Sequence, residues 1–428
     1  MDTKMNLKSY LPRVVDKTLD AYLSVFGAVC VEGPKWCGKT WTSARHARSS
    51  FFVSDPTANF SNRLLAFISP SRALIGEAPR LIDEWQETPA LWDAVRFEVD
   101  ARNRKGQFIL TSSSTPKRKG VLHGGAGRIG KLRMRTMSLY ELGFSSGKIS
   151  LRDLCNGNFD AGIIEETSID QIIDWVIRGG WPNNKDTDID NASFLPNSFI
   201  SSLLEDDSDT SIAYRLNKHK MELLLRSLAR NECTCVGNAT LLRDISEKDD
   251  GAIDLNTLKT YIDVFERMYL LDNQLPFADK IRSSTRVKIS EKRHFCDVSL
   301  ASALLKATPD KLLHDLNTLG FLFESLCEHD LKVYAESFGA SVYHYQDYKG
   351  NEIDAVIELK DGAWCAYEIK LGCDAVEEAA SKLLKIKGNI EKEGGLAPSF
   401  CCVIVGVGNT AYRRDDGVYV VPLAALKD

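Results

Sequence analysis

The sequence lacks any apolar run close to the roughly 20 residues that a transmembrane helix needs. The N-terminus, MDTKMNLKSY, also lacks the apolar core of a signal peptide. We therefore expect a cytoplasmic protein without a membrane partner. Hydrophobic residues make up 44% and charged residues 26% of the 428 positions, which is typical of a folded chain and gives no sign of extended disorder.

Cysteine pairs at metal-binding spacing are missing as well. None of the eleven cysteines stands in a CxxC pair, and the nearest neighbours are Cys233 with Cys235 and Cys401 with Cys402. This pattern predicts reduced thiols in a cytosolic protein and argues against a zinc site.

Acidic residues are absent from positions 101–140, although the whole chain has a net charge of -5. The net charge argues against a protein that wraps nucleic acid over its whole surface, so local patches matter more than the sum. The block carries ten basic residues: Arg102, Arg104, Lys105, Lys117, Arg118, Lys119, Arg128, Lys131, Arg133 and Arg135.

The chain reads as an α/β protein of several domains, because its length exceeds what one hydrophobic core usually serves. In residues 1–145, short apolar strands alternate with helical stretches, which predicts a parallel sheet covered on both faces. The expected strands are 28–31, 51–53, 80–82, 107–110 and 131–134.

The rest of the chain divides into three parts. Residues 146–210 are polar and are expected to be a helical connector, while residues 211–290 contain three helical patterns and a short apolar stretch that suit a winged helix. Residues 291–428 predict a second, smaller α/β domain. Its elements are a helix over 316–338, strands at 342–345, 352–359 and 364–371, a helix over 374–390 and a strand at 400–405.

A phosphate-binding loop is the clearest motif. Gly33-x-x-x-x-Gly38-Lys39-Thr40 follows a predicted strand and opens a predicted helix, which is the context that the P-loop pattern requires. Lys39 is expected to reach the β- and γ-phosphates of ATP, and the Thr40 hydroxyl is expected to bind Mg²⁺. The predicted nucleotide-binding residues are Gly33, Pro34, Lys35, Trp36, Cys37, Gly38, Lys39, Thr40 and Trp41.

A pair of carboxylates ends the predicted strand at 80–82. In the presence of a P-loop, Asp83 is expected to hold Mg²⁺ and Glu84 to polarise the attacking water. The plainer alternative is an acidic helix cap after a strand.

Two further residues are candidates for the nucleotide site. Thr111 begins the polar run Thr111 to Ser114 and could sense the γ-phosphate, as sensor residues do in AAA+ ATPases, or could be a turn residue. Arg128 could stabilise transition-state charge, within its own chain or on a neighbouring subunit of a homo-oligomer. It could instead be a surface arginine, or join Lys117, Arg118 and Lys119 in a nucleic-acid patch.

Several segments in one order carry a resemblance over nearly the whole chain: VEGPKWCGKT, LIDEWQETPALW, FILTSSS, GRIGKLRMRTMSLYELG, GGWP and EIDAVIELKDGAWCAYEIKLG. Together they resemble a prokaryotic AAA-type ATPase family whose C-terminal part is known only as a domain of unknown function. The resemblance implies an ATPase core, a winged-helix middle and a C-terminal domain similar to PD-(D/E)XK nucleases. Trp36 and Cys37 depart from the small or polar residues that are usual inside the loop.

The resemblance to nucleases implies a second metal site. In such domains a helix Glu, a strand carboxylate and a Glu-x-Lys bind one or two Mg²⁺ ions, and Glu324, Asp354, Glu368 and Lys370 stand in those places. Residues two apart on a strand face the same side, so Glu368 and Lys370 can act together, with Lys370 orienting the attacking water. Ordinary solvent-facing charges would give the same short pattern.

The winged-helix region gives a weaker indication of DNA binding. The charges of its last predicted helix, about 256–268, sum to zero, so that helix matches DNA poorly. Residues 279–293 carry six basic and two acidic residues and are better candidates for phosphate contacts, or form a solvated loop.

Three functions are compatible with these features. The first is an ATPase that couples nucleotide state to a nuclease-like effector acting on or binding nucleic acid, DNA in the first instance. The second is a regulatory ATPase switch with protein partners and no nuclease activity. A small-metabolite kinase fits less well, because no lid and acceptor pocket is evident beside the loop.

Overall fold

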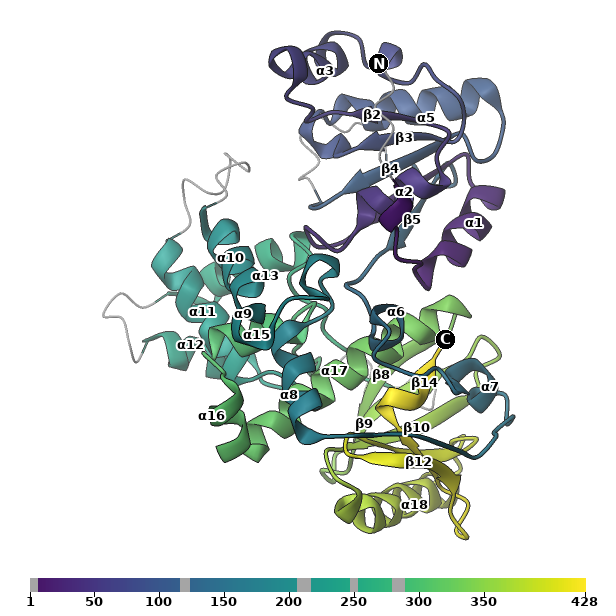
Figure 1. Ribbon diagram of the computed structural model, residues 1–428, viewed down its shortest axis with the longest axis vertical. Coiled ribbons are helices and arrows are strands. Elements are labelled where there is room, and N and C mark those ends of the chain that lie inside the picture. The colour runs from purple at the N-terminus through teal and green to yellow at the C-terminus, as the bar shows by residue number, and fades with distance from the viewer. Residues whose placement is uncertain (1–6, 116–123, 206–216, 247–252, 279–288) are drawn as a thin grey trace. The chain divides into compact units, whose positions relative to one another are not determined.

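The structure is a computed structural model that describes residues 7–115, 124–205, 217–246, 253–278 and 289–428. These form two compact units (Figure 1). The first comprises residues Met1–Thr136 with Phe265–Leu270, and the second comprises Met137–Val264 with Leu271–Asp428. The basic candidates at 117–119 and most of the segment 279–293 lie outside the described residues.

The first unit is built on a five-stranded sheet in which every neighbouring pair is parallel, as the sequence predicts. The strand order is β2-β3-β4-β1-β5. The strands are β1 (Ala28–Glu32), β2 (Ser49–Phe52), β3 (Arg80–Asp83), β4 (Phe108–Ser112) and β5 (Ile129–Arg133). Because the strands are parallel, the segments that follow β1, β3 and β4 leave the sheet at the same edge.

Helices cover both faces of this sheet because its strand residues are apolar on both sides. Ala28 and Cys30 of β1 join one core cluster, whereas Val29 and Val31 join another. The helices are α1 (Val15–Val25), α2 (Lys39–His46), α3 (Thr57–Ile68), α4 (Pro70–Ala73) and α5 (Ala90–Arg102), with the 3₁₀ turns η1 (Leu7–Ser9) and η2 (Trp85–Glu87). This double burial is what a parallel sheet requires.

The second unit begins with a mainly helical part. The three helices expected between residues 211 and 278 are present as α11 (Lys218–Arg230), α12 (Asn238–Ser246) and α13 (Leu255–Arg267), and the end of α13 from Phe265 belongs to the first unit. Up to residue 315 of this unit, the described residues also form α6 (Leu139–Leu142), α7 (Leu151–Cys155), α8 (Ile169–Arg178), η3 (Pro182–Asn184), α9 (Ile189–Ala192), α10 (Phe194–Glu205), α15 (Val298–Leu304) and α16 (Pro309–His314). Among the helices of the described ranges, none combines the length and apolar character needed to cross a membrane.

A seven-stranded mixed sheet follows, in the order β7-β12-β13-β11-β10-β9-β8. Its strands are β7 (Gly162–Thr167), β8 (Ser341–Gln346), β9 (Glu352–Glu358), β10 (Trp364–Lys370), β11 (Cys401–Val405), β12 (Gly408–Arg413) and β13 (Tyr419–Pro422), and β6 (Ile149–Ser150) pairs separately with β14 (Leu426–Lys427). The expectation of a purely helical connector over 146–210 is therefore wrong for β6 and β7. β7 is held by antiparallel pairing with β12, which lies more than 200 residues later in the chain.

Two long helices pack against this sheet. Buried residues of α18 (Val376–Lys392), among them Ala380 and Leu383, share a core cluster with Val356 and Ala366 of the strands. α17 (Leu316–Ser337) packs against β8, β9 and β10. The pairing of Tyr367 with Ala355 brings the end of β10 beside the start of β9.

Candidate functional site

The P-loop joins β1 to α2 and is shaped by two residues with positive φ. Trp36 has φ 66° and Gly38 has φ 101°, and a Cβ atom at Gly33 would lie 2.1 Å from the backbone oxygen of Met134. Only glycine therefore fits at position 33. Lys39 is buried, and its Nζ donates a hydrogen bond of 2.7 Å to the backbone oxygen of Pro34, so the ammonium group lies over the loop. A loop of this kind at a helix N-terminus is suited to bind an anion.

The carboxylate of Asp83 faces this loop from the end of β3. The hydroxyl of Thr40 donates to its Oδ1 at 2.8 Å, and the hydroxyl of Thr111, at the end of β4, donates to the same oxygen at 2.7 Å. Burial raises the pKa of Asp83, and the hydrogen bond from Thr111 opposes that effect. The parallel sheet thus brings together three oxygen-bearing side chains that are far apart in the sequence.

Glu84 is held by two contacts to the end of β4. Its backbone has φ 56°, and its N–H donates to Thr111 Oγ1 at 2.9 Å. Its Oε2 accepts a hydrogen bond of 2.9 Å from the hydroxyl of Ser113 and another from the amide of Gln86. Thr111 therefore contacts both acidic residues, and Ser113 fixes the second carboxylate.

A buried arginine supports the loop from behind. Arg13 donates through Nη1 to the backbone oxygen of Cys37 at 2.8 Å and through Nη2 to the backbone oxygen of Arg135 at 2.9 Å. Its guanidinium group therefore ties the middle of the P-loop to the segment after β5. No sequence pattern points to this role, because Arg13 lies about 20 residues before the loop with no motif around it.

The second candidate site lies where β9 and β10 meet. Asp354 Oδ2 accepts a hydrogen bond of 2.7 Å from the backbone N–H of Ile369. Lys370 Nζ lies 2.9 Å from Glu368 Oε1 and 3.8 Å from Asp354 Oδ2, and Lys382 of α18 lies 2.6 Å from the same Glu368 oxygen. The structure therefore brings together the Asp354, Glu368 and Lys370 that the sequence singled out.

The remaining residue of that set, Glu324 of α17, faces a lysine. Lys292 Nζ lies 2.5 Å from Glu324 Oε1, 2.8 Å from Glu328 Oε1 and 3.3 Å from the backbone oxygen of Asp354. Burial would lower the pKa of Lys292, but the carboxylates of Glu328 and Glu324 raise it well above its ordinary value. Lys292 is therefore a charged, buried member of this cluster. It is one of the basic residues of 279–293 that were expected to contact phosphate or form a solvated loop, and its burial among carboxylates makes that expectation wrong for Lys292.

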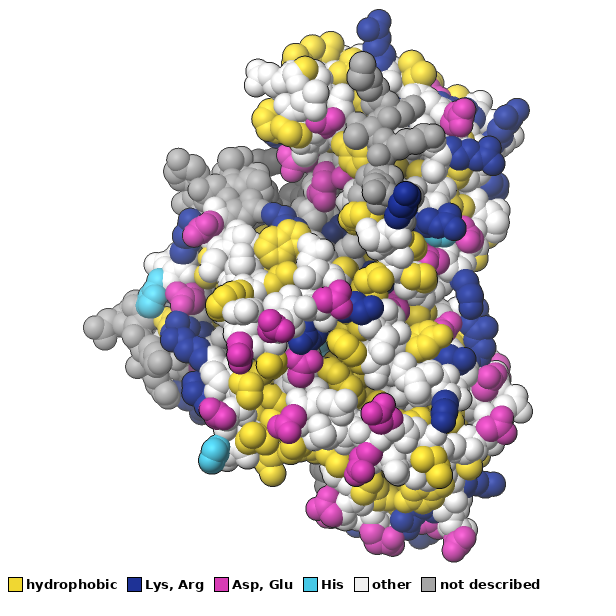
Figure 2. All heavy atoms as spheres, in the orientation of Figure 1, with side chains coloured by type: hydrophobic (Ala, Val, Ile, Leu, Met, Phe, Trp, Pro, Cys, Tyr) yellow, Lys and Arg dark blue, Asp and Glu magenta, His cyan; other side chains and the backbone are white. Residues whose placement is uncertain are grey.

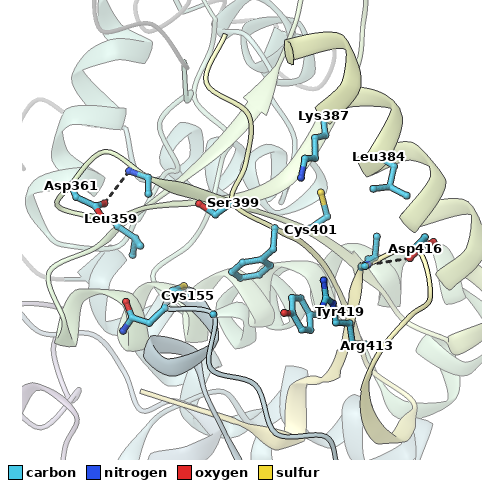
Figure 3. A pocket seen from close by; sticks show the side chains of 16 residues that line it. Cys155, Leu359, Asp361, Leu384, Lys387, Ser399, Cys401, Arg413, Asp416 and Tyr419 are labelled. Carbon is cyan, nitrogen blue, oxygen red and sulfur yellow. Dashed lines mark hydrogen bonds between the residues drawn. The ribbon is translucent and has the colours of Figure 1, made fainter. Parts of the chain in front are cut away.

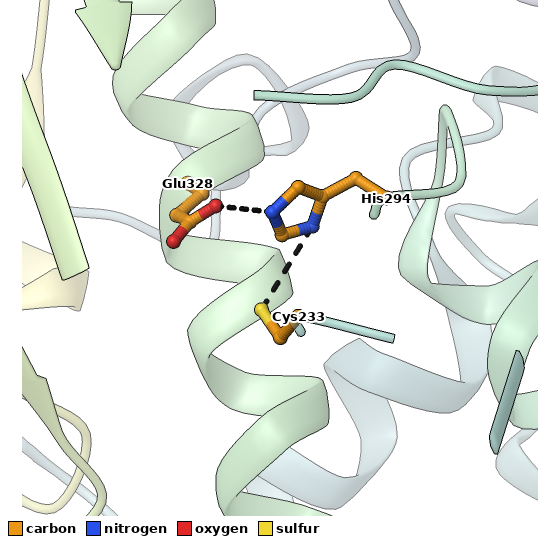
Figure 4. A group of neighbouring side chains, drawn as sticks. All are labelled: Cys233, His294 and Glu328. Carbon is orange, nitrogen blue, oxygen red and sulfur yellow. Dashed lines mark hydrogen bonds and ion pairs between the residues drawn. The ribbon is translucent and has the colours of Figure 1, made fainter. Parts of the chain in front are cut away.

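The charged cluster continues to a buried histidine (Figure 4). His294 Nε2 lies 2.5 Å from Glu328 Oε2, while its Nδ1 lies 3.1 Å from Glu232 Oε1 and 3.8 Å from Cys233 Sγ. A metal ion could be held by a group of three or more His, Cys, Asp or Glu side chains. Among the described residues, one such group has its ligand atoms within 4.8 Å of one another, and it consists of Cys233, His294 and Glu328. However, the thiol and the carboxylate face different ring nitrogens, so one metal ion could not bind all three groups as they stand. The arrangement is that of a buried ion-pair network.

Family models match three segments of the chain. Residues 26–143 match the model described as an AAA domain. Together with the parallel sheet, the P-loop and the two strand-end carboxylates, this match decides the nature of the first unit. The chain contains an AAA-type P-loop ATPase domain.

The other two matches name no activity. Residues 169–311 and 319–426 match two families that are each described as a domain of unknown function, DUF8612 and DUF4143. No curated protein matches the chain. The ATPase domain is therefore the part of the chain whose chemistry the comparisons identify.

Solved structures with similarity to the chain include three nucleotide-binding proteins. A Walker-type ATPase of Pyrococcus abyssi matches with 12% identity and a TM-score of 0.41, over 71% of this chain and 98% of that one. The AAA domain of FIGL-1 in complex with ADP matches with 13% identity and a TM-score of 0.23, over 60% of this chain and 85% of that one. A signal transduction ATPase with a tetratricopeptide repeat sensor from Pyrococcus horikoshii matches with 10% identity and a TM-score of 0.22, over 78% of this chain and 49% of that one. Because all three scores are below 0.5, the fold assignment rests on the sheet and loop geometry.

Arg128 lies at the opposite edge of the ATPase sheet from the P-loop. Its backbone oxygen accepts a hydrogen bond from Ala28, the first residue of β1, whereas the loop follows the last residue of that strand. The half-exposed guanidinium group pairs with Asp100 at 3.0 Å. The structure therefore does not bring Arg128 and Lys39 of one chain together, and action on a neighbouring subunit stays a prediction.

A pocket of about 550 Å³ lies at the other end of the second sheet (Figure 3). It is lined where β10, β11 and β13 begin, whereas Glu368 and Lys370 lie near the end of β10. Lys387 of α18 points into it, and the guanidinium carbon of Arg413 lies 5.4 Å from the ring centre of Tyr419. The pocket is thus separate from the carboxylate cluster and contains none of the predicted site residues.

Proposed function

We propose that the ATPase domain binds and hydrolyses ATP with Mg²⁺, and that its nucleotide state controls a nuclease-like C-terminal domain that acts on or binds nucleic acid. The observation that carries the effector part is the convergence of Asp354, Glu368 and Lys370 at the junction of β9 and β10. The alternative is a regulatory ATPase whose C-terminal domain only binds protein.

The donor set beside the P-loop fits Mg²⁺-ATP. The Thr40 hydroxyl and the Asp83 carboxylate are hard oxygen ligands 2.8 Å apart, which suits Mg²⁺. Lys39 would leave the Pro34 oxygen and contact the β- and γ-phosphates. The bound Mg²⁺ would neutralise charge that develops on the phosphate oxygens.

Glu84 is the proposed residue for activating water. Its carboxylate would accept the proton of a water molecule that attacks the γ-phosphorus, so that the bond from phosphorus to the β,γ-bridging oxygen breaks and ADP and phosphate leave. The hydrogen bonds from Ser113 and Gln86 to Oε2 would position that carboxylate. Thr111 would position it through the backbone N–H of Glu84.

The C-terminal residues also fit a divalent cation. Glu368 is fully buried, and its Oε2 has no hydrogen-bond partner among the described residues, although Oε1 contacts two lysines. A buried carboxylate oxygen without a partner is costly unless a cation or proton meets it. Asp354 and Glu368 would hold the cation, and Lys370 would orient the water that attacks a phosphodiester.

The helical part of the second unit is the proposed place for nucleic-acid contact. A winged helix is supported by α11, α12 and α13 and by the antiparallel bridges Leu271 to Phe295 and Gln274 to Lys292, which resemble the strands of a wing. The face in Figure 2 mixes acidic and basic side chains. On this face, phosphate contacts would therefore come from local clusters and not from a surface of one sign.

The ATPase part is tested by measuring Mg²⁺-dependent ATP turnover of wild type, Lys39→Ala and Glu84→Gln, each with and without single- and double-stranded DNA. We expect both variants to lose turnover and DNA to stimulate the wild type. If no condition gives turnover in the wild type, the first unit binds nucleotide without hydrolysing it.

The effector part is tested by nicking of supercoiled plasmid with Mg²⁺ or Mn²⁺. We expect nicking that is lost in Asp354→Ala and retained in Asp361→Ala, a matched change in the exposed turn between β9 and β10. Nicking that survives Asp354→Ala would come from a contaminant or another site and would remove the support for the effector.

The regulatory switch is favoured by one observation. Glu324 contacts Lys292, and Glu368 contacts Lys370 and Lys382, so lysines already balance these carboxylates. If this balance excludes metal, ATP turnover without any nicking is expected under every condition, and the C-terminal domain then serves as a docking module.

A further inference from the structure

Lys292 and the carboxylates that it contacts lie in segments that match two different families. Lys292 lies within the segment 169–311 that matches one family of unknown function, whereas Glu324, Glu328 and Asp354 lie within the segment 319–426 that matches another. Both segments belong to the second compact unit from residue 271 onward. The cluster is therefore built from two matched families and is not complete in either one.

The backbone of Lys292 is fixed in place. Its N–H donates to the backbone oxygen of Gln274 at 2.9 Å, and its own backbone oxygen accepts from the N–H of Gln274 at 2.9 Å. The side-chain amide of Gln274 donates through Nε2 to the backbone oxygen of Tyr343 on β8 at 2.9 Å. This short antiparallel pairing aims the lysine side chain at α17 and β9.

The ammonium group of Lys292 is saturated by protein oxygens. A lysine ammonium has three N–H donors. The three oxygens around it are Glu324 Oε1 at 2.5 Å, Glu328 Oε1 at 2.8 Å and the backbone oxygen of Asp354 at 3.3 Å. The side chains of Lys292 and Glu328 are 9% and 1% exposed, so this is a buried cation with a complete set of oxygen partners.

The rest of the cluster offers a different set of oxygens. Asp354 uses Oδ2 to accept from the Ile369 N–H, and Glu368 presents Oε2, which is buried and lacks a hydrogen-bond partner among the described residues. A second divalent cation beside Glu324 would have to displace Lys292 or lie next to its charge. Both are unfavourable in a buried site.

We propose that the Lys292 ammonium group takes the place of a second metal cation. The C-terminal site then binds a single divalent metal ion, held by Asp354 and Glu368. Glu324 serves as the ion-pair partner of Lys292 and not as a metal ligand. This inference rests on the proposed metal site, and it limits that site to one metal ion and two carboxylate ligands. It replaces the expectation from the sequence that Glu324 binds metal.

The test is Mn²⁺ binding by the full-length, nucleotide-free chain, measured by isothermal titration calorimetry. All variants carry Thr40→Ala, which weakens metal binding at the P-loop. We expect one Mn²⁺ per chain, an affinity within about twofold of that value in Glu324→Gln, and a loss of at least about tenfold in Glu368→Gln, because removing a ligand costs at least as much as removing an outer-shell partner. Glu336→Gln, an exposed change on the same helix α17, is the matched control and should bind as the parent does.

The outcomes separate the two hypotheses. If Glu324→Gln loses Mn²⁺ as Glu368→Gln does, or if two Mn²⁺ bind per chain, Lys292 does not take a cation's place, while the proposed metal site stands. If the parent binds no Mn²⁺, or Glu368→Gln has no effect, the metal site itself is refuted and the inference with it.

A second variant keeps the inference testable if Glu324→Gln fails to fold. Gln retains an acceptor for Lys292, so the fold should persist, and circular dichroism checks it. If it does not persist, the double change Lys292→Met with Glu324→Leu replaces the ion pair by apolar groups of similar size, which buried pairs often tolerate. One Mn²⁺ per chain in this variant supports the inference, and loss of binding in a folded double variant overturns it.

Discussion

Thr111 forms hydrogen bonds with both acidic residues of the nucleotide site. Its hydroxyl donates to Asp83 Oδ1 and accepts from the backbone N–H of Glu84. Thr111→Val keeps the shape and removes both hydrogen bonds. A hydrogen bond to a charged group contributes about 1.5–3 kcal/mol, so we expect kcat for ATP hydrolysis to fall roughly 10- to 100-fold. Steady-state kinetics with Mg²⁺-ATP would measure this.

The matched control is Thr115→Val, four residues further along. The Thr115 hydroxyl lies 2.7 Å from the Tyr269 hydroxyl and does not contact the carboxylates. Its kcat should stay close to that of the wild type. Equal effects of the two substitutions would show that Thr111 acts only through general stability.

Arg13 acts on the P-loop through the backbone oxygen of Cys37. Arg13→Lys keeps the charge but cannot reproduce a guanidinium group that reaches two separate backbone oxygens. Losing about 1–2 kcal/mol at the loop should raise the Kd of ATP about tenfold, as a titration with a fluorescent ATP analogue would show.

The control for this change is Arg63→Lys on α3. Arg63 is 57% exposed and pairs with Glu87 at 3.3 Å, so its replacement should leave nucleotide affinity unchanged. An unchanged Kd in Arg13→Lys would mean that the loop keeps its shape without the guanidinium group.

At the scale of elements, His46 of α2 joins this helix to α1 through two aspartates. His46 Nδ1 lies 2.7 Å from Asp20 Oδ1, and Nε2 lies 3.3 Å from Asp16 Oδ1. The hydrogen bond to Asp16 is the main cause that raises the pKa of His46 above 6.5, against the effect of burial. Burial would raise the pKa of Asp16, but hydrogen bonds from His46, Tyr10 and the backbone N–H of Arg13 lower it overall.

The two shifts act in different pH ranges. The raised pKa of His46 gives stability that is fully present below pH 6.5 and is lost as the pH rises through the higher pKa of the folded state. The contribution of Asp16 is lost only at acid pH, below 3.8. His46→Gln should therefore lower the melting temperature by about 2 °C near pH 6 and by less near pH 8.5. His219→Gln, on an exposed turn of α11, should have no effect at either pH, and a pH-independent effect of His46→Gln would exclude the ion pairs as its cause.

The elements that the sequence predicts well are those whose apolar pattern is local. All five strands of the ATPase sheet were expected within a few residues, as were α17, α18 and β8 to β11. β7 and β12 were missed because both are polar segments, GIIEET and GNTAYR, and their strand conformation depends on partners far away in the sequence. β7 is an edge strand that pairs with β12, and β12 lies between β7 and β13. The period-2 burial that identifies a strand is weak in such segments.

The same distinction applies to the sites. The proximity of Thr40 to Asp83, and of Asp354 to Glu368 and Lys370, was predictable, because motifs fix the spacing and the sheets bring neighbouring strands together. The functional roles of these residues stay predictions. The contacts of Lys292 and Arg13 were not predictable, because each acts through tertiary contacts to backbone or side-chain oxygens more than 20 residues away in sequence.

At the scale of the whole molecule, the two sites lie in separate compact units, so coupling between them has to be measured as a free energy. If ATP binding changes the affinity for DNA by some factor, thermodynamic linkage requires DNA to change the affinity for ATP by the same factor.

The variant Glu84→Gln makes this coupling measurable, because slow hydrolysis keeps ATP bound. For the coupled effector we expect a factor of roughly 5 to 150 in both directions, from titrations of DNA with and without ATP and of ATP with and without DNA. A factor of one in both directions, with tight binding of each ligand alone, would show two independent modules and would leave the regulatory ATPase with protein partners as the better account. Unequal factors would mean that one titration had not reached equilibrium, since linkage admits no other reason for the difference.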